Sequence, residues 1–230
     1  MKKEIEKTKE KKYYIFEFNM AIMNIVSVAI FVILILLSAF MIPDTGNPGN
    51  VNLVILLVLY FGYMVLHEIF HSIAYVLYGG SFKKIIYGAY LEKGIFYCQC
   101  KQNITRKNIL NALLFPLFYL GIVTFIIAVI FDLQTLLFLS IFNISGCAGD
   151  ILMFMYIIKL NKNIEFSEFD NPIQFAIYSN EDVSKVKHFG LNFIKTADKL
   201  ERKDLKKITI SKGTIIVLII FALLGILSIL

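Results

Sequence analysis

Three ionisable side chains lie within five residues of one another in the stretch His67-Glu68-Ile69-Phe70-His71. If this stretch is helical, His67 and His71 lie four residues apart on one face, so both imidazoles can reach a single metal ion. Glu68 lies beside them, where a carboxylate can take a proton from a water molecule at the metal. The pattern predicts a hydrolytic zinc centre with two histidine ligands and Glu68 as the catalytic residue.

The sequence around this motif is almost entirely apolar, from Val51 to Tyr78. An ionisable group at membrane depth costs several kcal/mol unless it is paired or bound to a metal. Three such groups in five residues are therefore hard to explain as packing. The alternative is a polar contact between helices, or a proton or ion relay.

A tetrahedral catalytic zinc takes three protein ligands and leaves a fourth position for water. Asp150 is the candidate for the third ligand, because it is the only acidic residue inside the other long apolar segments. His67 lies 16 residues after Val51, and Asp150 lies 17 residues after Leu133. Parallel helices that start at these points place the groups at similar depth. The alternative role for Asp150 is to cap a helix or to pair with another span.

Small residues flank Asp150 and permit close approach between helix backbones, as a shared metal would require. They are Gly146, Ala148 and Gly149. Asn143, seven residues before Asp150 and on nearly the same face, could position a substrate or a ligand by hydrogen bonding, or could join two helices. Cys147 could replace Asp150 as a thiolate ligand, or could be a small buried apolar residue.

The composition predicts a membrane protein. Of the 230 residues, 58% are apolar and 17% are charged, against about 45–50% and about 25% in soluble domains. The apolar residues form blocks long enough to cross a bilayer as helices, separated by polar stretches. We therefore expect an all-α polytopic membrane protein with about five transmembrane helices. The blocks are residues 19–42, 51–78, 110–131, 133–159 and 213–230.

The polar connection at residues 81–109 has strand-like runs, which predict a short membrane-edge β-hairpin between the second and third spans. Residues 1–18 contain six lysines and four glutamates, which indicate a solvated tail or a short surface helix. The expected organisation is a cytoplasmic tail at 1–18, a four-helix metallopeptidase core at 19–160, a cytoplasmic polar segment at 161–212 and a C-terminal transmembrane helix at 213–230.

Positive charges predict the orientation. The tail has six, residues 81–109 have six and residues 159–212 have eleven, whereas the connections at 43–50 and at Asp132 have none. The positive-inside rule then places the N-terminus in the cytoplasm and the C-terminus outside. Because the basic residues flank the apolar blocks, the net charge of +6 does not indicate nucleic-acid binding. The predicted partners are the lipid bilayer and a membrane-anchored protein or peptide substrate.

The remaining candidate ligands have weaker support. Cys98 and Cys100 lie two residues apart, which places both on one side of a strand, but no third ligand lies nearby in the sequence. We expect reduced thiols. His188 lies in a polar segment without ligand-like neighbours, and we expect a surface histidine.

With these motifs, the sequence resembles the site-2 protease group of intramembrane zinc metalloproteases. It resembles more closely a bacterial family of small membrane proteins described as zincin peptidases. The resemblance covers roughly residues 55–180 and implies that His67, His71 and Asp150 bind zinc, that Glu68 is the general base, and that the strand at 85–100 pairs with an unwound substrate. The matching stretches are His67–His71, residues 88–93, Cys98-Gln99-Cys100 through Pro116, Asn143–Asp150 and Asp170-Asn171-Pro172.

The chain departs from these families at two positions. Gly149-Asp150-Ile151 stands where site-2 proteases usually carry Leu-Asp-Gly, and Ser72 stands where the closer family often has glycine after the second histidine. These departures leave the ligand set intact and bear on substrate choice.

The sequence therefore predicts a zinc metallopeptidase that hydrolyses peptide bonds of membrane-anchored substrates near the cytoplasmic face. A metal-binding protein without enzymatic activity, or a cation transporter, would use the same ligands, although transporters tend to be built from repeated halves and the sequence has no repeat. An aspartic intramembrane protease would need a second aspartate in another span, and Asp132 lies in a turn at the opposite face.

Overall fold

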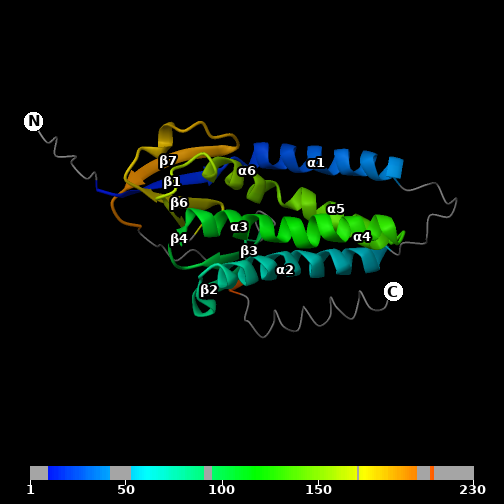
Figure 1. Cartoon of the computed structure of the whole chain (residues 1–230). Helices are drawn as coiled ribbons and strands as arrows, with labels where there is room; N and C mark the ends of the chain where they lie inside the picture. The colour runs from blue at the N-terminus through cyan, green and yellow to red at the C-terminus, as the bar shows by residue number, and fades with distance from the viewer. Residues whose placement is uncertain (1–9, 42–52, 91–94, 170, 201–207, 210–230) are drawn as a thin grey trace, which may run out of the picture.

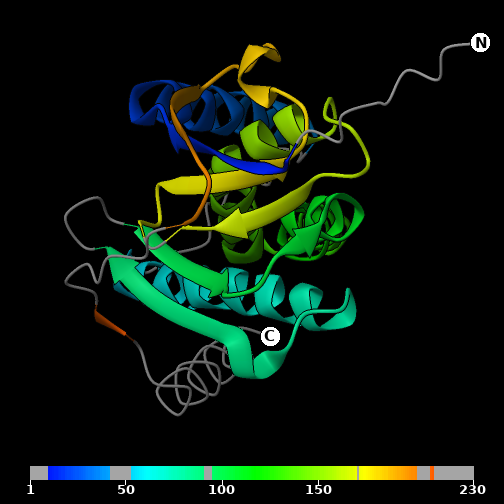
Figure 2. The ribbon, with the colours of Figure 1, turned by 90° about the vertical axis from the view of Figure 1, so that its left-hand side faces the viewer.

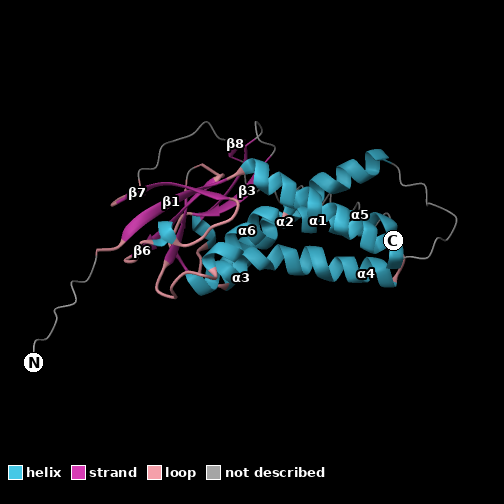
Figure 3. Cartoon of the chain, turned by 90° about the horizontal axis from the view of Figure 1, so that it is seen from above, coloured by secondary structure: helices cyan, strands magenta, loops and turns pink. Residues whose placement is uncertain are grey.

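The helices and the strands of this chain occupy separate regions. The computed structural model describes residues 10–41, 53–90, 95–169, 171–200 and 208–209. The helices lie side by side, and the strands gather at one end of them (Figure 1). The same separation is seen from above (Figure 3). Most charged side chains of the described residues belong to the end that carries the strands.

In the part of the chain that the structure describes, three helical spans are long and apolar enough to cross a membrane, and a bent pair of helices would make a fourth. The three are α1 (Met20–Met41), α2 (Leu53–Leu77), and the composite of α3 (Arg106–Pro116), the π-helix η3 (Leu117–Val123) and α4 (Thr124–Ile130). The bent pair is α5 (Gln134–Gly146) and α6 (Ala148–Ile157), which meet at 42°.

The outer helix α1 buries none of its apolar side chains. Phe40 is 88% exposed, and Ile25 and Val28 are also exposed. Soluble monomers rarely expose an apolar surface of this extent. The exposure therefore favours a lipid environment for α1.

The larger sheet has five antiparallel strands in the order β4-β5-β6-β1-β7. The first strand of the chain is central in it: Phe16 is opposite Phe175 of β6 on one side and Phe193 of β7 on the other. The strands are β1 (Lys12–Phe18), β4 (Ile104–Thr105), β5 (Glu165–Glu168), β6 (Gln174–Ser179) and β7 (Leu191–Ala197). Segments from both ends of the chain thus share one sheet.

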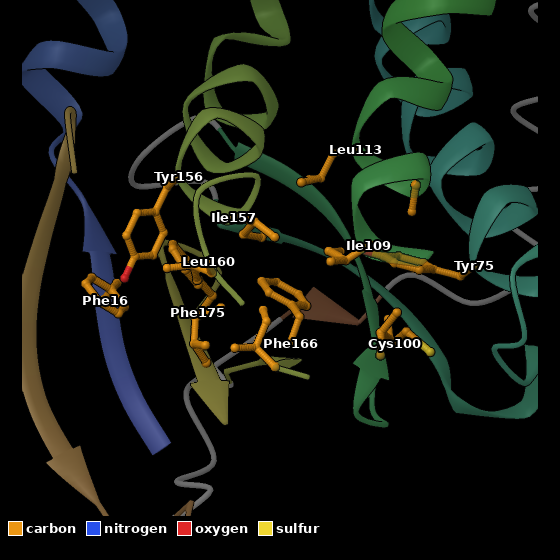
Figure 4. Packing of buried hydrophobic residues seen from close by; sticks show 14 of the residues in the cluster. Phe16, Tyr75, Cys100, Ile109, Leu113, Tyr156, Ile157, Leu160, Phe166 and Phe175 are labelled. Carbon is orange, nitrogen blue, oxygen red and sulfur yellow. The ribbon is translucent and has the colours of Figure 1, made fainter. Parts of the chain in front are cut away.

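Aromatic rings join this sheet to the helices (Figure 4). Phe16 is fully buried, with its ring centroid 4.9 Å from that of Tyr156 on α6 and 5.7 Å from that of Phe175. Phe166 of β5 stacks on Phe175 at 5.7 Å. The main hydrophobic core therefore lies between the sheets and the strand-side ends of α2, α3 and α6.

The smaller sheet has the order β3-β2-β8 and comprises β2 (Ile85–Tyr90), β3 (Ile95–Cys100) and β8 (Ile208–Thr209). Its hairpin pairs Ile85 with Cys100 and Tyr90 with Ile95. Seen from the strand end, the hairpin lies across α2 and the larger sheet lies beside α1 and α6 (Figure 2). Among the described residues, no strand pairs with the outer edge of β3.

The expectation of an all-α protein is wrong. Two antiparallel sheets accompany the helices, and they include residues 12–18, which were expected to be a tail, and much of 161–197, which was expected to be a polar segment. These strands are short and lie in stretches that contain many lysines and glutamates, so the stretches resemble solvated connections. Each becomes a strand because its apolar face packs against the helix ends, a tertiary effect that local sequence does not reveal.

The predicted positions of the first four apolar spans agree with the structure, unlike the predicted fold class. Three single spans and one bent pair occupy the positions of the first four apolar blocks, although the third span begins earlier, at Arg106. The hairpin expected between the second and third spans is present as β2 and β3. The fifth expected helix, 213–230, and the connection at 43–50 lie outside the described residues.

Candidate metal centre

The helix α2 places the two histidines on one face, as their spacing requires. The Nε2 atoms of His67 and His71 are 3.1 Å apart, and the ring centroids are 4.8 Å apart. His71 is buried and His67 is half-buried. Two imidazole nitrogens this close can share one ion.

The break between α5 and α6 brings Asp150 to these rings. The helix restarts at Ala148, which leaves Asp150 in the first turn of α6, where the helix dipole favours a negative side chain. Its Oδ2 atom is 3.4 Å from Nε2 of His67 and 3.4 Å from Nε2 of His71. The three ligand atoms all lie within 4.8 Å of one another, the one such group of candidate ligands among the described residues.

These separations fit a tetrahedral zinc ion. With zinc bonds of about 2.0–2.1 Å, two ligand atoms of a tetrahedral site are about 3.3 Å apart. The observed 3.1, 3.4 and 3.4 Å lie close to this value. The donor set of two imidazoles and one carboxylate is also one that catalytic zinc takes.

Hydrogen bonds on the far side of each ring determine which nitrogen faces the centre. His71 Nδ1 is 3.0 Å from the carbonyl oxygen of Ala112, which can only accept, so Nδ1 carries the proton. His67 Nδ1 is 3.0 Å from Oδ1 of Asn143, whose Nδ2 donates to the carbonyl of Pro116 at 3.3 Å. Both neutral rings therefore turn an Nε2 lone pair toward the same point, where the Asp150 carboxylate also lies. Three acceptors facing one another require a cation or a proton between them.

Glu68 lies one residue from the first ligand and lines the same cavity. Its polar neighbours include the backbone of Cys98 on β3. The carboxylate therefore lies between the candidate ligands and the outer strand of the hairpin, where it can act on a water molecule beside the metal.

The cavity has a volume of about 460 Å³ and opens between the helices and both sheets. Its walls come from α1, α2, β3, α5, α6 and the β5–β6 region. Every residue of β3 from Ile95 to Gln99 lines it, as do Met23 and Asn24 of α1. The candidate metal centre is thus reached by a space large enough for a peptide segment.

The other candidate residues lie in different surroundings. The Asn143 side chain is occupied by His67 and Pro116, so it holds a ligand rather than extending freely toward a substrate. The Cys147 sulfur is 3.9 Å from Nδ1 of His67, on the side of the ring away from Nε2. The sulfur therefore lies behind the ring, outside the ligand group.

The two hairpin cysteines and the third histidine lie apart from the ligand group. Burial raises the pKa of the Cys98 thiol and raises that of Cys100 to about 11, so both are neutral. They are free thiols. His188 is half-buried rather than on the surface, with its ring edge-on to Phe16 at 5.6 Å.

Two polar residues of the cavity were missed by sequence reasoning. Glu168 of β5 is half-buried there, and Tyr75 donates its hydroxyl to Glu168 Oε1 at 2.7 Å. The backbone N–H of Cys100 donates to the other carboxylate oxygen. Burial raises the pKa of Glu168 to about 8. Tyr75 could have been found, because it follows His71 by four residues on the same face, but no local pattern distinguishes Glu168.

The comparison with known families agrees with this site. Residues 59–164 match the model of the family described as "Putative zincin peptidase". The matched segment contains His67, Glu68, His71, Asn143 and Asp150. The name of this family denotes a zinc-dependent metallopeptidase.

No curated protein and no solved structure matches the chain. The resemblance to site-2 proteases stays a prediction.

Proposed function

We propose that this protein is a membrane-embedded zinc metallopeptidase that hydrolyses peptide bonds of membrane-anchored substrates near the cytoplasmic face. The observation that carries the proposal is the convergence of two imidazole lone pairs and the Asp150 carboxylate on one point in a cavity. The proposal assigns His67, His71 and Asp150 as the zinc ligands and Glu68 as the general base.

The chemistry follows from these assignments. A zinc ion at this point supplies Lewis acidity, which polarises the scissile carbonyl and makes water a better nucleophile near neutral pH. Glu68 takes the proton from the attacking water and delivers it to the leaving nitrogen. The hydrogen bonds at Nδ1 of both histidines hold the rings while the charge at the site changes.

The open edge of β3 supports an extended peptide as the substrate. The amide of Lys101, just after β3, donates to the carbonyl of Lys84, just before β2. Because amides alternate in direction along a strand, those of Phe96, Cys98 and Cys100 point away from β2. The amides of Phe96 and Cys98 are thus at the edge that borders the cavity. A peptide can add to such an edge as a further strand.

A membrane-anchored substrate follows from the setting of the cavity. In a bilayer, backbone amides are bonded within their own helix, so a spanning segment must unwind before it is cut. The metal ligands lie toward the end of α2 that is next to the strands, where the lysines of the described residues also gather. The positive-inside rule assigns that end to the cytoplasm.

Zinc content and cleavage test the proposal. Wild-type protein in detergent should carry one zinc per chain, and His71→Ala and Asp150→Asn should lose most of it. Glu68→Gln should retain zinc but lose cleavage of casein and of a single-span reporter by at least about 100-fold, since a general base contributes that much or more. The control is His188→Ala, which removes the third histidine of the chain, away from the ligand group.

Full activity in Glu68→Gln would refute the role of general base. Wild-type protein without zinc would refute the metal centre. Zinc uptake into vesicles that is lost in His71→Ala, with no cleavage of either substrate, would instead establish a cation carrier.

A further inference from the structure

The third span changes its hydrogen-bond register beside the metal centre. It begins as α3, reaches Pro116, continues as the π-helix η3 and returns to α-helix at Thr124. π-helical turns are rare and are frequent at functional sites. A proline inside a helix also deprives the carbonyl four residues earlier of its usual donor.

That carbonyl belongs to Ala112, the residue that accepts from His71. Pro116 has no N–H to offer it, and the next amide, Leu117, donates to Leu114 instead. The Ala112 oxygen is therefore open to a donor from outside the helix. His71 Nδ1 supplies that donor at 3.0 Å.

The carbonyl of Pro116 orients the second histidine, His67, through the side chain of Asn143. It accepts from Asn143 Nδ2 at 3.3 Å, which determines the orientation of the amide. The Oδ1 atom of Asn143 is then left facing Nδ1 of His67 at 3.0 Å. Each candidate histidine ligand is thus oriented from the break in this span.

A third carbonyl, four residues further on, continues the series. The Thr124 amide donates to Gly121, so Leu120 lacks its usual α-helical donor. The Leu120 oxygen instead accepts from the hydroxyl of Tyr63 on α2 at 2.8 Å and from the hydroxyl of Thr124 in its own span. The carbonyls of residues 112, 116 and 120 together bind donors from α2 and α5.

Gly121 allows this close approach. A Cβ atom at Gly121 would lie 2.7 Å from Ile144 Cγ1 and 3.4 Å from Asn143 Nδ2. The π-helix therefore packs directly against the part of α5 that carries Asn143. The register change, the glycine and the amide form one contact.

We propose that Pro116 is a positioning device for the metal ligands: by withholding an amide from Ala112 it keeps that carbonyl available to orient His71, while its own carbonyl orients His67 through Asn143. This inference rests on the proposed metal centre. It explains why a proline, which weakens a helix, lies inside this span.

The test is Pro116→Ala, which restores an amide able to donate to Ala112 in competition with His71. We expect zinc affinity to fall about 10- to 100-fold, the usual cost of losing such a supporting hydrogen bond. The metal-free protein should melt at the same or a higher temperature, because alanine is the better helix former. Zinc affinity is measured by competition with a chelator, and melting in the same detergent.

An ester analogue is the matched control. Replacing Pro116 with the α-hydroxy acid analogue of alanine removes the ring but still supplies no N–H. This variant should bind zinc like the wild type. ¹⁵N NMR of the zinc-free protein should show the Nδ1–H tautomer of His71 in the wild type and the ester analogue, and a mixture of tautomers in Pro116→Ala.

The outcomes separate the two ideas. If the wild type binds zinc and Pro116→Ala binds it equally well with the same tautomer, the positioning role is overturned and the metal centre stands. If the ester analogue loses affinity as Pro116→Ala does, the missing amide is not the cause and the inference is also overturned. A wild type that binds no zinc removes the metal centre and this role with it.

Discussion

The two histidines depend on different kinds of partner. Nδ1 of His71 donates to a backbone carbonyl, whereas Nδ1 of His67 donates to the side chain of Asn143. A backbone acceptor persists through side-chain changes as long as the local helix is unchanged. The orientation of His71 therefore depends on the helix around Pro116, and that of His67 also depends on one amide.

Glu168 should make the stability of the protein depend on pH. Its pKa is raised from 4.5 to about 8 by burial, so the folded state holds a proton that the unfolded state has already released between these values. Stability should fall as pH rises through this window. Replacing Glu168 with glutamine removes the titration, so the zinc-free variant should lose less of its melting temperature than the wild type between pH 5 and pH 8, by about 5–10 °C.

Glu165→Gln is the matched control for this measurement. Glu165 lies in the same strand but is paired with Lys11 near the surface. Its variant should follow the wild-type pH profile. If Glu168→Gln also follows that profile, the raised pKa is wrong.

The spacing of residues predicts part of this site and not the rest. His67, Glu68 and His71 are recognised because helical geometry joins residues four apart, and Asp150 because it is alone in an apolar segment. Glu168 has neither signal, since it lies in a polar strand and approaches the cavity only through the fold. The Ala112 carbonyl lacks its helical donor because a proline follows four residues later, and the sequence shows that proline. The sequence does not show that His71 faces this carbonyl, so the role of the carbonyl could not be predicted.

At the scale of elements, the outer edge of β3 combines two tasks. The Cys100 amide is bonded to Glu168, which ties the strand to the larger sheet. The amides of Phe96 and Cys98 point to the same side, along the cavity. One end of the edge is thus used for structure, the Cys98 amide faces the Glu68 carboxylate, and the Phe96 amide is the one we expect a peptide to use.

Phe96→Pro tests the use of this edge. Proline removes the outward amide but no hydrogen bond to β2, so the hairpin should persist. We expect kcat/KM for a peptide substrate to fall about 5- to 10-fold, the worth of one hydrogen bond, with zinc content unchanged. Phe96→Ala is the control, because it removes the side chain but keeps the amide. Equal losses of kcat/KM in both variants would argue against edge pairing.

The elements also differ in how far the sequence predicts them. The helices follow from long apolar runs such as Leu53–Leu77, where one solution satisfies the backbone in lipid. Strand β1 does not, because it begins within a lysine-rich stretch, at Lys12, and its partners β6 and β7 lie more than 150 residues further along the chain. The sequence likewise predicted one continuous span at 133–159, where the structure has the 42° break between α5 and α6.

At the scale of the whole molecule, an aromatic cluster joins the helices to the larger sheet. Phe16 is fully buried between Tyr156 of α6 and Phe175 of β6. Phe16→Ala should destabilise the protein by about 3–5 kcal/mol, the usual cost of removing a buried phenylalanine. Chemical denaturation in detergent measures this loss.

Phe193→Ala is the control, because Phe193 is the β7 residue opposite Phe16 and is 37% exposed. It should cost far less. If the two variants are equally stable, the cluster does not hold the sheet to the helices.

The central position of β1 has a consequence for biosynthesis. This strand leaves the ribosome first, yet its neighbours β6 and β7 begin at Gln174 and Leu191. Until those segments have been translated, β1 has no partner on either side, and the cavity lacks the wall that Glu168 and the β5–β6 region provide. A nascent chain that ends before Gln174 would therefore carry both histidines of α2 without the wall that completes the cavity, so any activity proposed for this site would have to wait until β5 and β6 have been made.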